Sequence, residues 1–288
     1  MHVLTLIAPP GELSAAAVAR VRDAVRGGEP VMLSEGEAAD IPCHAPPVPD
    51  DVQAALDAAP VDAVLTGATS RRKRLLVADM DSTIVTTETL DELAAYAGLG
   101  TEVAAITRRS MNGELDFAAA LSERVAMLRG LPLGALEQTW ASTTLMPGAR
   151  ELVATMRAHG AYTALVSGGF TWFTGRVAAA CGFDTHRANE LLHDGAALTG
   201  AVGEPILDRG AKLATMQELV AQHGLAMADC LAVGDGANDL AMIGAAGLGV
   251  AFHAKPIVAE AARARVDYCG LRALLFMQGY AAREFANA

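Results

Sequence analysis

Residues 75–85 read LLVADMDSTIV, an apolar run that leads directly into two acidic residues, Asp79 and Asp81. The run is typical of a β-strand buried on both faces, and the end of such a strand needs only one turn-forming residue. Two carboxylates spaced two residues apart instead place both side chains on the same side of an extended backbone. Because the two groups repel each other unless a cation or a proton lies between them, this strand end predicts a metal site or acid–base chemistry.

Similar apolar runs recur further along the chain and alternate with helical patterns. The runs RLLVADM, AYTALVSGG, DCLAVGDG and LGVAF are typical of parallel strands, and PGARELVATMRAHG between two of them is typical of a helix that ends near a glycine. Asp194-Gly195, between two apolar runs, indicates an antiparallel hairpin beside the sheet. These patterns predict the α/β class with a Rossmann-like parallel sheet at its core.

Two regions differ from this pattern. Between residues 89 and 145 the strand patterns vanish, and four helical patterns predict a helical cap inserted after the first core strand: TLDELAAYAG, GTEVAAITRRSM, LDFAAALSERVAMLRG and LGALEQTWASTT. Residues 1–70 mix short apolar runs with Ala-rich helical stretches and predict a small α/β domain without a chemical motif. Its proline-rich segment IPCHAPPVPDD is expected to be a loop. The basic run RRKR at 71–74 is interpreted as a solvated junction, so the catalytic core is expected to comprise residues 71–88 and 146–288.

The composition excludes several classes of protein. Of the 288 residues, 52% are hydrophobic and 19% are charged, which is enough apolar surface for buried cores. The net charge of −11 argues against nucleic acid and anionic membranes as partners, but not against a small anionic substrate. Four scattered cysteines, the absence of a signal-peptide pattern and the absence of about 18 unbroken apolar residues lead us to expect a cytoplasmic protein without a membrane span. A homodimer stays open.

Polar residues follow the predicted strands at the points where these strands end. Besides Asp79 and Asp81, these are Ser167-Gly168-Gly169 after one strand and GDGAND at 234–239 after another, with Lys212 early in a helix. Because parallel sheets bind ligands at the carboxyl ends of their strands, we expect these groups to lie together. Carboxylates suit Mg²⁺, whereas a lysine, a serine and backbone N–H groups suit a phosphate. The combination predicts phosphoryl transfer to a carboxylate, without an ATP-binding P-loop.

Each motif has a structural alternative when taken alone. DMDST is compatible with a strand-ending turn, Lys212 with a surface helix position, and GDGAND with an Asx-type turn that caps the next helix. In the cap, Phe117, Leu121, Val125 and Leu128 form one apolar stripe with Arg124 at its border. Arg124 either extends to solvent or presents its guanidinium to a carboxylate beneath the cap. The four motifs in this order favour chemistry over the structural alternatives.

The chain resembles the haloacid dehalogenase superfamily of aspartyl-phosphate enzymes through DxDST at 79–83, Ser167, Lys212 and GDGxND at 234–239. Within the superfamily it resembles the phosphoserine phosphatases over about residues 75–270, and the segments that carry this closer resemblance are DMDSTIVTTETLDELA, RRSMNGELDFAAALSERVAMLRG, LVSGGF, ANELLHDGAALTG, VGDGANDLAMI and AGLGVAFHAKP. The resemblance implies Mg²⁺-dependent hydrolysis of O-phospho-L-serine to L-serine and phosphate, the last step of serine biosynthesis.

The resemblance also implies roles for individual residues. Asp79 would be the nucleophile that becomes an aspartyl phosphate, and Asp81 the general acid and then the general base. Asp79, the backbone carbonyl of Asp81 and Asp235 would hold Mg²⁺. The residues that would hold phosphoryl oxygens or arrange the metal and phosphate shell are Ser167, the Gly168 N–H, Lys212, Asn238 and Asp239.

Substrate choice is expected to depend on the cap. The resemblance implies that Glu88 pairs with the amino group of serine and Arg124 with its carboxylate, under an apolar lid of Met111 and Phe117. Glu88 could instead be an acid at a helix N-terminus, and the lid residues could be ordinary cap core. Two other functions stay open: an enzyme for another small phosphomonoester such as phosphohomoserine, and a non-catalytic amino-acid sensor, against which the intact nucleophile and acid argue. Some family members carry regulatory, ACT-like domains where residues 1–70 lie, but the resemblance of this segment assigns none.

Overall fold

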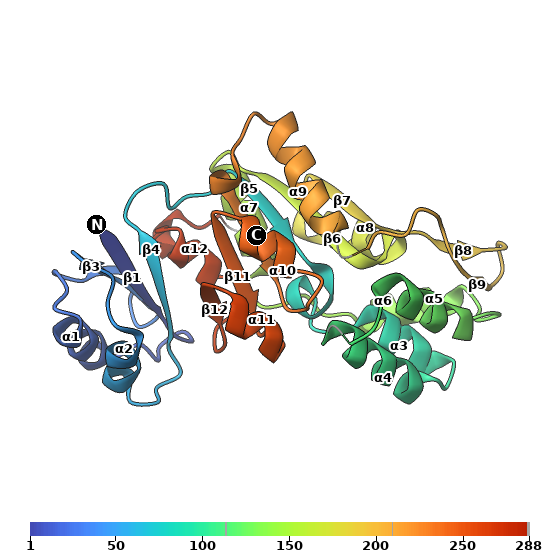
Figure 1. Cartoon of the computed structure of the whole chain (residues 1–288), viewed down its shortest axis with the longest axis horizontal. Helices are drawn as coiled ribbons and strands as arrows, with labels where there is room; N and C mark the ends of the chain where they lie inside the picture. Colours follow the sequence, from blue (N-terminus) through green and yellow to red (C-terminus); the bar gives the residue numbers. More distant parts are fainter. Residues whose placement is uncertain (113, 209, 287–288) are drawn as a thin grey trace.

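The computed structural model describes residues 1–112, 114–208 and 210–286. Its long axis runs from a small N-terminal unit, through a central parallel sheet, to a group of four helices at the opposite end (Figure 1). Within the described residues, no helix is both long enough and apolar enough to cross a membrane. The predicted α/β class with a parallel core sheet is confirmed.

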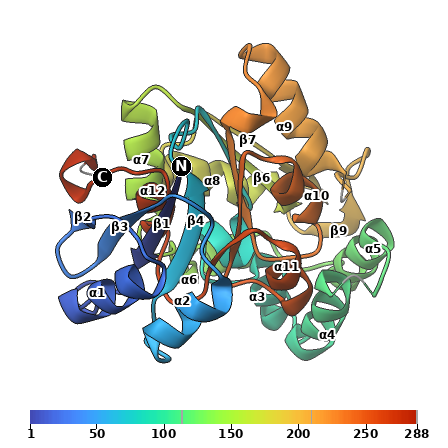
Figure 2. The same ribbon diagram turned by 60° about the vertical axis from the view of Figure 1, so that its left-hand side comes forward.

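The N-terminal unit is a four-stranded antiparallel sheet in the order β2-β3-β1-β4, with two helices on one face (Figure 2). Alternate residues of β1 face opposite sides, so Leu4 and Leu6 pack under the helices while Thr5 and Ile7 face the rest of the molecule. The elements are β1 (His2–Ile7), α1 (Ala15–Ala24), β2 (Val31–Ser34), β3 (Ala38–Cys43), α2 (Pro49–Leu56) and β4 (Asp62–Gly67).

The central sheet has six parallel strands in the order β12-β11-β10-β5-β6-β7. Its strands are β5 (Leu75–Ala78), β6 (Tyr162–Phe170), β7 (Thr185–Asn189), β10 (Cys230–Gly234), β11 (Leu248–Phe252) and β12 (Ala264–Val266). The helices around it are α7 (Ala149–Ala158), α8 (Thr171–Cys181), α9 (Ala211–Gln222), α10 (Leu240–Ala245), α11 (Pro256–Ala261) and α12 (Ala273–Met277).

Helices cover both faces of this sheet, which explains why its strands are apolar throughout. Leu76 and Ala78 of β5 belong to the cluster that contains buried residues of α7, α8 and α12. Leu75 and Val77 belong to the opposite cluster, with buried residues of α9, α10 and α11. A strand buried on both faces gains apolar contacts from every residue, so the alternation of a half-buried strand does not develop.

Four helices follow the first core strand, as expected, and form the cap: α3 (Thr89–Tyr96), α4 (Gly100–Met111), α5 (Phe117–Met127) and α6 (Gly134–Ser142). The predicted hairpin is present as β8 (Leu191–His193) and β9 (Leu198–Val202). It packs against α5, and Gly130 after that helix donates its N–H to the Leu198 carbonyl. The hairpin is therefore attached to the helical cap as well as to the core.

Some local expectations were wrong. The proline-rich segment was expected to be a loop from Ile41, but β3 continues through Cys43 because its backbone pairs with β1, and α2 begins at Pro49. β7 and β12 were not predicted either. Both are short edge strands, and residues such as Thr185 and Arg265 give their sequences no continuous apolar run. Pairing with the neighbouring strand defines them, rather than local propensity.

The expectation of a solvated basic junction was also wrong for Arg71. Its guanidinium forms an ion pair with buried Asp40 of β3 at 2.5 Å and donates to Thr5 and to the carbonyls of Phe276 and Met277. Both charged side chains are about one-tenth exposed, so neither charge is solvated well enough to stand alone. Arg71 thus joins the N-terminal sheet to α12 of the core.

Two further groups of contacts hold the same junction. Asp62 of β4 is buried and accepts backbone N–H groups of Asp267, Tyr268 and Cys269, which follow β12. Arg272 before α12 forms an ion pair with buried Glu37. The N-terminal unit is therefore held against the core by polar contacts at three points, and the apolar face of its sheet joins the cluster of the core.

Replacing Arg71 by Met should lower the free energy of unfolding by roughly 3 kcal/mol, because Asp40 is left as a buried carboxylate without its cation. Urea denaturation followed by circular dichroism measures this change. The matched control is Arg74→Met, since Arg74 is exposed and its side chain has no partner among the described residues. We expect the control to change stability by less than about 0.5 kcal/mol. Equal midpoints for the two variants would contradict the role assigned to Arg71.

Candidate active site

A tight turn after β5 places Asp79 and Asp81 in one cavity. Asp79 accepts the Met80 N–H at 2.7 Å, and the chain reverses at Ser82, which has a positive φ of 54°. Asp81 accepts the N–H of Thr89, the first residue of α3, at 2.8 Å and the Ser167 hydroxyl at 3.2 Å. The start of the cap and the end of β6 therefore orient the second carboxylate.

Lys212 is buried at the centre of the carboxyl edge of the sheet. Its Nζ lies 2.7 Å from Asp79 and 2.6 Å from Asp239, and the residue is only 3% exposed, so the alternative of a surface helix position was wrong. It is the second residue of α9, whose start is fixed by Asp208 accepting the N–H groups of Gly210 and Ala211. The helix therefore begins where its lysine can reach the carboxylates of two different strand ends.

Asp235, directly after β10, is fully buried, and its two carboxylate oxygens accept no hydrogen bond from any described residue. Lys255 Nζ lies 3.3 Å from its Oδ2 as an ion pair. Burial and the charge of Asp239, against the opposing charges of Lys255 and Lys212, together raise the pKa of Asp235 to about 6. Because buried carboxylates normally accept hydrogen bonds, a carboxylate with only one ion-pair partner at 3.3 Å suits the binding of a further cation.

The carboxylates of Asp79, Asp235 and Asp239 each offer an oxygen within 4.8 Å of the others. Their three negative charges face the ammonium of Lys212 and the partly exposed one of Lys255. A Cβ atom at Gly234 would lie 2.2 Å from Cγ of Asp239, so glycine allows this close packing. An excess of oxygen donors and negative charge in a buried site fits a hard divalent cation.

The protonation of this cluster follows from burial and from its neighbours. Burial raises the pKa of Asp79, the charge of Asp239 adds to this effect, and Lys212 opposes it. Burial alone would lower the pKa of Lys212, but Asp239 and Asp79 outweigh it and the pKa is raised. Lys212 therefore stays charged, whereas burial and mutual repulsion make ionisation of all the carboxylates unfavourable without a further cation. A divalent cation would supply the missing positive charge.

The segment Ser167-Gly168-Gly169, predicted to follow a strand, lies within the last residues of β6, where the pairing with β7 is irregular. It is held in place from two sides. Ser167 Oγ accepts the N–H of Gly169 at 2.8 Å, while Asn189 of β7 donates to the Gly168 carbonyl at 2.9 Å and accepts the Leu207 N–H at 2.7 Å. A Cβ atom at Gly168 would lie 2.5 Å from Cζ of Phe117, so the ring of Phe117 packs directly on the backbone of Gly168. Phe117 thus lines the cavity as well as packing on the core.

Glu88, directly before α3, and Arg124 of α5 bring an acidic and a basic group to the same cavity. Glu88 precedes α3 but caps no N–H group; its side chain accepts the Ser82 hydroxyl at 2.6 Å. Burial raises its pKa to about 8, with further contributions from the charges of Asp81 and Asp235. Glu88 is therefore a buried acid that needs a cation to ionise near neutral pH.

Arg124 is only 7% exposed, so the alternative of a side chain that extends to solvent was wrong. It donates to the Ala120 carbonyl at 3.1 Å and to the Thr107 hydroxyl at 2.8 Å. Thr107 in turn donates to Asp91 at 2.5 Å. The guanidinium has no carboxylate partner among the described residues, although it is buried. The guanidinium is therefore oriented by neutral groups, and its positive charge is available to pair with a bound anion.

The cavity between the turn and the cap is about 40 Å³, which holds water but no larger molecule. Asn238 also lines it. Met111 is the last residue of α4, but its side chain lies outside the described part of the structure, as does all of Gly113. We therefore expect that α5, which carries Phe117 and Arg124, moves away from the sheet when a larger molecule enters.

Three residues of the site were not singled out in the sequence. Lys255 follows β11 at the same edge of the sheet, so the rule that places ligands at carboxyl ends of strands could have indicated it. Thr107 and Asp91 lie on different cap helices and meet at Arg124 only through tertiary packing. No local pattern marks either of them.

Comparison with known proteins places this geometry among hydrolases. The sequence model of the haloacid dehalogenase-like hydrolases matches residues 76–244. The phosphoserine phosphatase of Archaeoglobus fulgidus is 43% identical over 209 residues, which are 72% of this chain and 61% of that protein. The chain spans 53% of the corresponding protein of Mycobacterium tuberculosis, at 44% identity over 218 residues that make up 76% of this chain. Little more than half the length of such relatives is therefore represented here.

One solved structure extends the likeness over nearly the whole chain. A probable phosphoserine phosphatase from Vibrio cholerae, in unliganded form, is 32% identical with a TM-score of 0.80, covering 98% of this chain and 88% of that one. The N-terminal unit is therefore part of the shared architecture.

Replacing Asp235 by Asn should abolish stabilisation by MgCl₂ yet stabilise the metal-free protein. The raised pKa of Asp235 means that its charge costs folding free energy above about pH 6, and this cost disappears as the pH falls toward its unfolded value. At pH 7.5 in EDTA the variant should be more stable by roughly 1–3 kcal/mol, with almost no difference at pH 4. Thermal denaturation with and without MgCl₂ measures both effects. Unchanged stabilisation by MgCl₂ would show that Asp235 holds no metal.

Proposed function

Because the chain belongs to the haloacid dehalogenase-like hydrolase family, we propose that it acts as a phosphoserine phosphatase, hydrolysing O-phospho-L-serine to L-serine and phosphate. The observation that carries the proposal is that Asp79 and Asp81 line the same cavity as Glu88 and Arg124. The first pair suits phosphoryl transfer. The second pair suits a molecule that carries an ammonium and a carboxylate, as serine does. This reaction would end the biosynthesis of serine.

The first step forms a bond between a carboxylate oxygen of Asp79 and phosphorus and breaks the bond from phosphorus to the serine oxygen. Asp81 gives its proton to that departing oxygen, then takes a proton from the water that attacks the aspartyl phosphate, which releases phosphate and restores Asp79. Burial raises the pKa of Asp81, against hydrogen bonds from Thr89 and Ser167, which favours a carboxyl that can donate a proton near neutral pH.

We propose that Mg²⁺ is the cation, held by Asp79, Asp235 and the backbone carbonyl of Asp81, with Asp239 and Asn238 arranging its surroundings. When bound, it offsets the repulsion between the nucleophilic carboxylate and the phosphate dianion. Lys212 and the Ser167 hydroxyl contribute donors to phosphoryl oxygens, together with the Gly168 N–H. Lys212 suits this role because Asp239 and Asp79 raise its pKa and keep it cationic.

The cap would recognise the amino acid by charge. Glu88 would receive the ammonium, and Arg124, oriented through Thr107, would receive the carboxylate as a two-point contact. Phe117 and Met111 would close over the substrate and exclude water. In this proposal residues 89–145 set specificity, residues 71–88 with 146–288 carry the chemistry, and residues 1–70 are a separate unit. The four cysteines of the whole chain are free and buried, which suits a cytoplasmic location.

Phosphate release from L-phosphoserine should exceed release from phosphothreonine, phosphohomoserine and para-nitrophenyl phosphate, and EDTA should abolish the release.

Arg124→Ala should lower kcat/KM for L-phosphoserine by about 100-fold, because a charge-assisted hydrogen-bonded contact is lost, with little effect on the aryl phosphate. Asp79→Asn should be inactive, and Arg129→Ala is the matched control because Arg129 is exposed near the end of the same helix. Equal losses on both substrates would make Arg124 structural.

Binding of L-phosphoserine should release a proton from Glu88 below about pH 8, because the ammonium pairs only with the ionised carboxylate. As the pH falls from 8 to 7, Glu88 becomes protonated in the free protein, so apparent affinity should weaken by about fivefold. Calorimetry in two buffers of different ionisation enthalpy measures the released proton, with Asp79→Asn and MgCl₂ preventing turnover. The same release in an Asp79→Asn, Glu88→Gln variant would contradict this role.

A further inference from the structure

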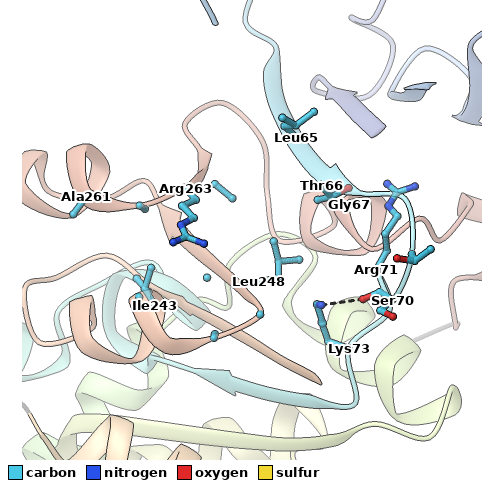
Figure 3. A pocket seen from close by; sticks show the side chains of 17 residues that line it. Leu65, Thr66, Gly67, Ser70, Arg71, Lys73, Ile243, Leu248, Ala261 and Arg263 are labelled. Carbon is cyan, nitrogen blue, oxygen red and sulfur yellow. Dashed lines mark hydrogen bonds between the residues drawn. The ribbon is translucent and has the colours of Figure 1, made fainter. Parts of the chain in front are cut away.

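A second cavity, of about 380 Å³, lies at the junction between the N-terminal unit and the core (Figure 3). Its walls come from three segments: the end of β4 with the linker after it, the turn between α10 and β11, and the turn between α11 and β12. Leu248 begins β11 and Lys73 precedes β5, so the cavity lies at the amino end of the core sheet. The catalytic carboxylates lie at the carboxyl end, so this is a separate site.

The cavity is lined by basic residues and by no acidic residue among those described. This is unusual in a chain with 33 acidic and 22 basic residues. The Lys73 ammonium donates at 2.9 Å to the carbonyls of Ser70 and Ala228, and forms no ion pair with a described carboxylate. Burial lowers the pKa of Lys73, against the nearby charge of Asp229. One of its three donors is therefore left for another partner.

Arg263 faces Lys73 across the same space, and Figure 3 shows both cationic groups directed into it. No hydrogen bond or ion pair joins the Arg263 side chain to the described part of the chain, and the residue is exposed. Arg71 also lines the cavity, but its guanidinium is turned toward the N-terminal sheet and is occupied by Asp40. The free positive charge in the cavity thus comes from Lys73 and Arg263.

The other walls suit the body of a small molecule. Thr66 Oγ1 is buried without a hydrogen-bond partner among the described residues, and Thr69 and Ser70 add hydroxyl groups. Ile243 and Leu248 form an apolar wall opposite them. Binding sites for small molecules typically combine such apolar walls with a few polar groups, in cavities from about 300 Å³ upward.

We propose that this cavity binds a small organic anion, with its carboxylate or phosphate group between Lys73 and Arg263 and its body against Ile243 and Leu248. The inference does not depend on the proposed phosphatase activity. The ligand touches Thr66 of the N-terminal unit and residues of the core, so its affinity depends on the docked arrangement. By linkage, binding stabilises the docking of the N-terminal unit.

The test uses the full chain in EDTA with propylphosphonate and, separately, butyrate as probes that cannot be hydrolysed. Calorimetry should detect saturable binding of at least one probe by the wild type and by Arg74→Gln, which removes a neighbouring exposed charge outside the cavity. The Lys73→Gln, Arg263→Gln double variant should bind roughly tenfold more weakly or not at all. Preference for propylphosphonate identifies a phosphate ester as the natural class, and preference for butyrate a carboxylic acid.

Hydrogen exchange locates the probe, because binding at the catalytic edge would leave the junction unprotected. Protection at residues 66–73 and 243–249 supports the proposal, and protection only at the catalytic edge overturns it. Equal affinity of the double Gln variant and the wild type also overturns it, as does the absence of saturable binding for both probes. A Lys73→Arg, Arg263→Lys variant, which keeps both charges, should retain binding. If the double Gln variant does not fold, Arg263→Gln alone provides the comparison, since Arg263 is exposed.

Discussion

The buried ammonium of Lys212 is the constraint on which the rest of the carboxyl edge depends. It must be charged to hold Asp79 and Asp239 together, and it can be charged only because both carboxylates lie within 2.7 Å. Removing one partner would leave an uncompensated buried charge, which costs about 3–5 kcal/mol. The positions of α9 and of the ends of β5 and β10 are therefore set by charge as much as by apolar packing. Even so, the cluster has a surplus of negative charge, and that surplus suits it for a cation.

Where the cap meets the sheet, in contrast, the ionisable groups have no ion-pair partners among the described residues. Arg124 is held by a hydroxyl and a carbonyl rather than by a carboxylate, and Glu88 by a hydroxyl. Each group is thereby oriented without an ion-pair partner. Arg124 keeps its charge, whereas Glu88, with its pKa raised to about 8, is protonated near neutral pH until a cation pairs with it. Asp91 acts on Arg124 through Thr107, so it stabilises the charge without occupying the face that a carboxylate would take. A direct ion pair between Asp91 and Arg124 would instead occupy the guanidinium donors that a ligand carboxylate would use.

The sequence predicted what depends on strand ends and missed what depends on partners distant in sequence. Asp79, Ser167 and Asp235 could be grouped because parallel strands bring their carboxyl ends to one edge, and apolar runs mark those strands. Arg71 was interpreted as solvated, since nothing in RRKR signals the buried Asp40 that lies 31 residues earlier. Thr107 failed to stand out for the same reason. Its role exists only where three cap helices, α3, α4 and α5, meet. Short edge strands such as β12 likewise arise from pairing rather than from local preference.

The two ends of the core sheet are connected by elements of unequal rigidity. β5 runs from the junction to Asp79, but backbone hydrogen bonds to β10 on one side and β6 on the other prevent it from sliding. α10 is a helix of six residues that begins directly after Asp239. Ile243 and Gly244 of this helix line the second cavity, at the junction with the N-terminal unit. A short helix held mainly by side-chain packing shifts more easily than a central strand. Any influence of the N-terminal unit on the carboxyl edge should therefore pass through α10 to Asp239 and Lys212, and leave Asp79 on β5 in place.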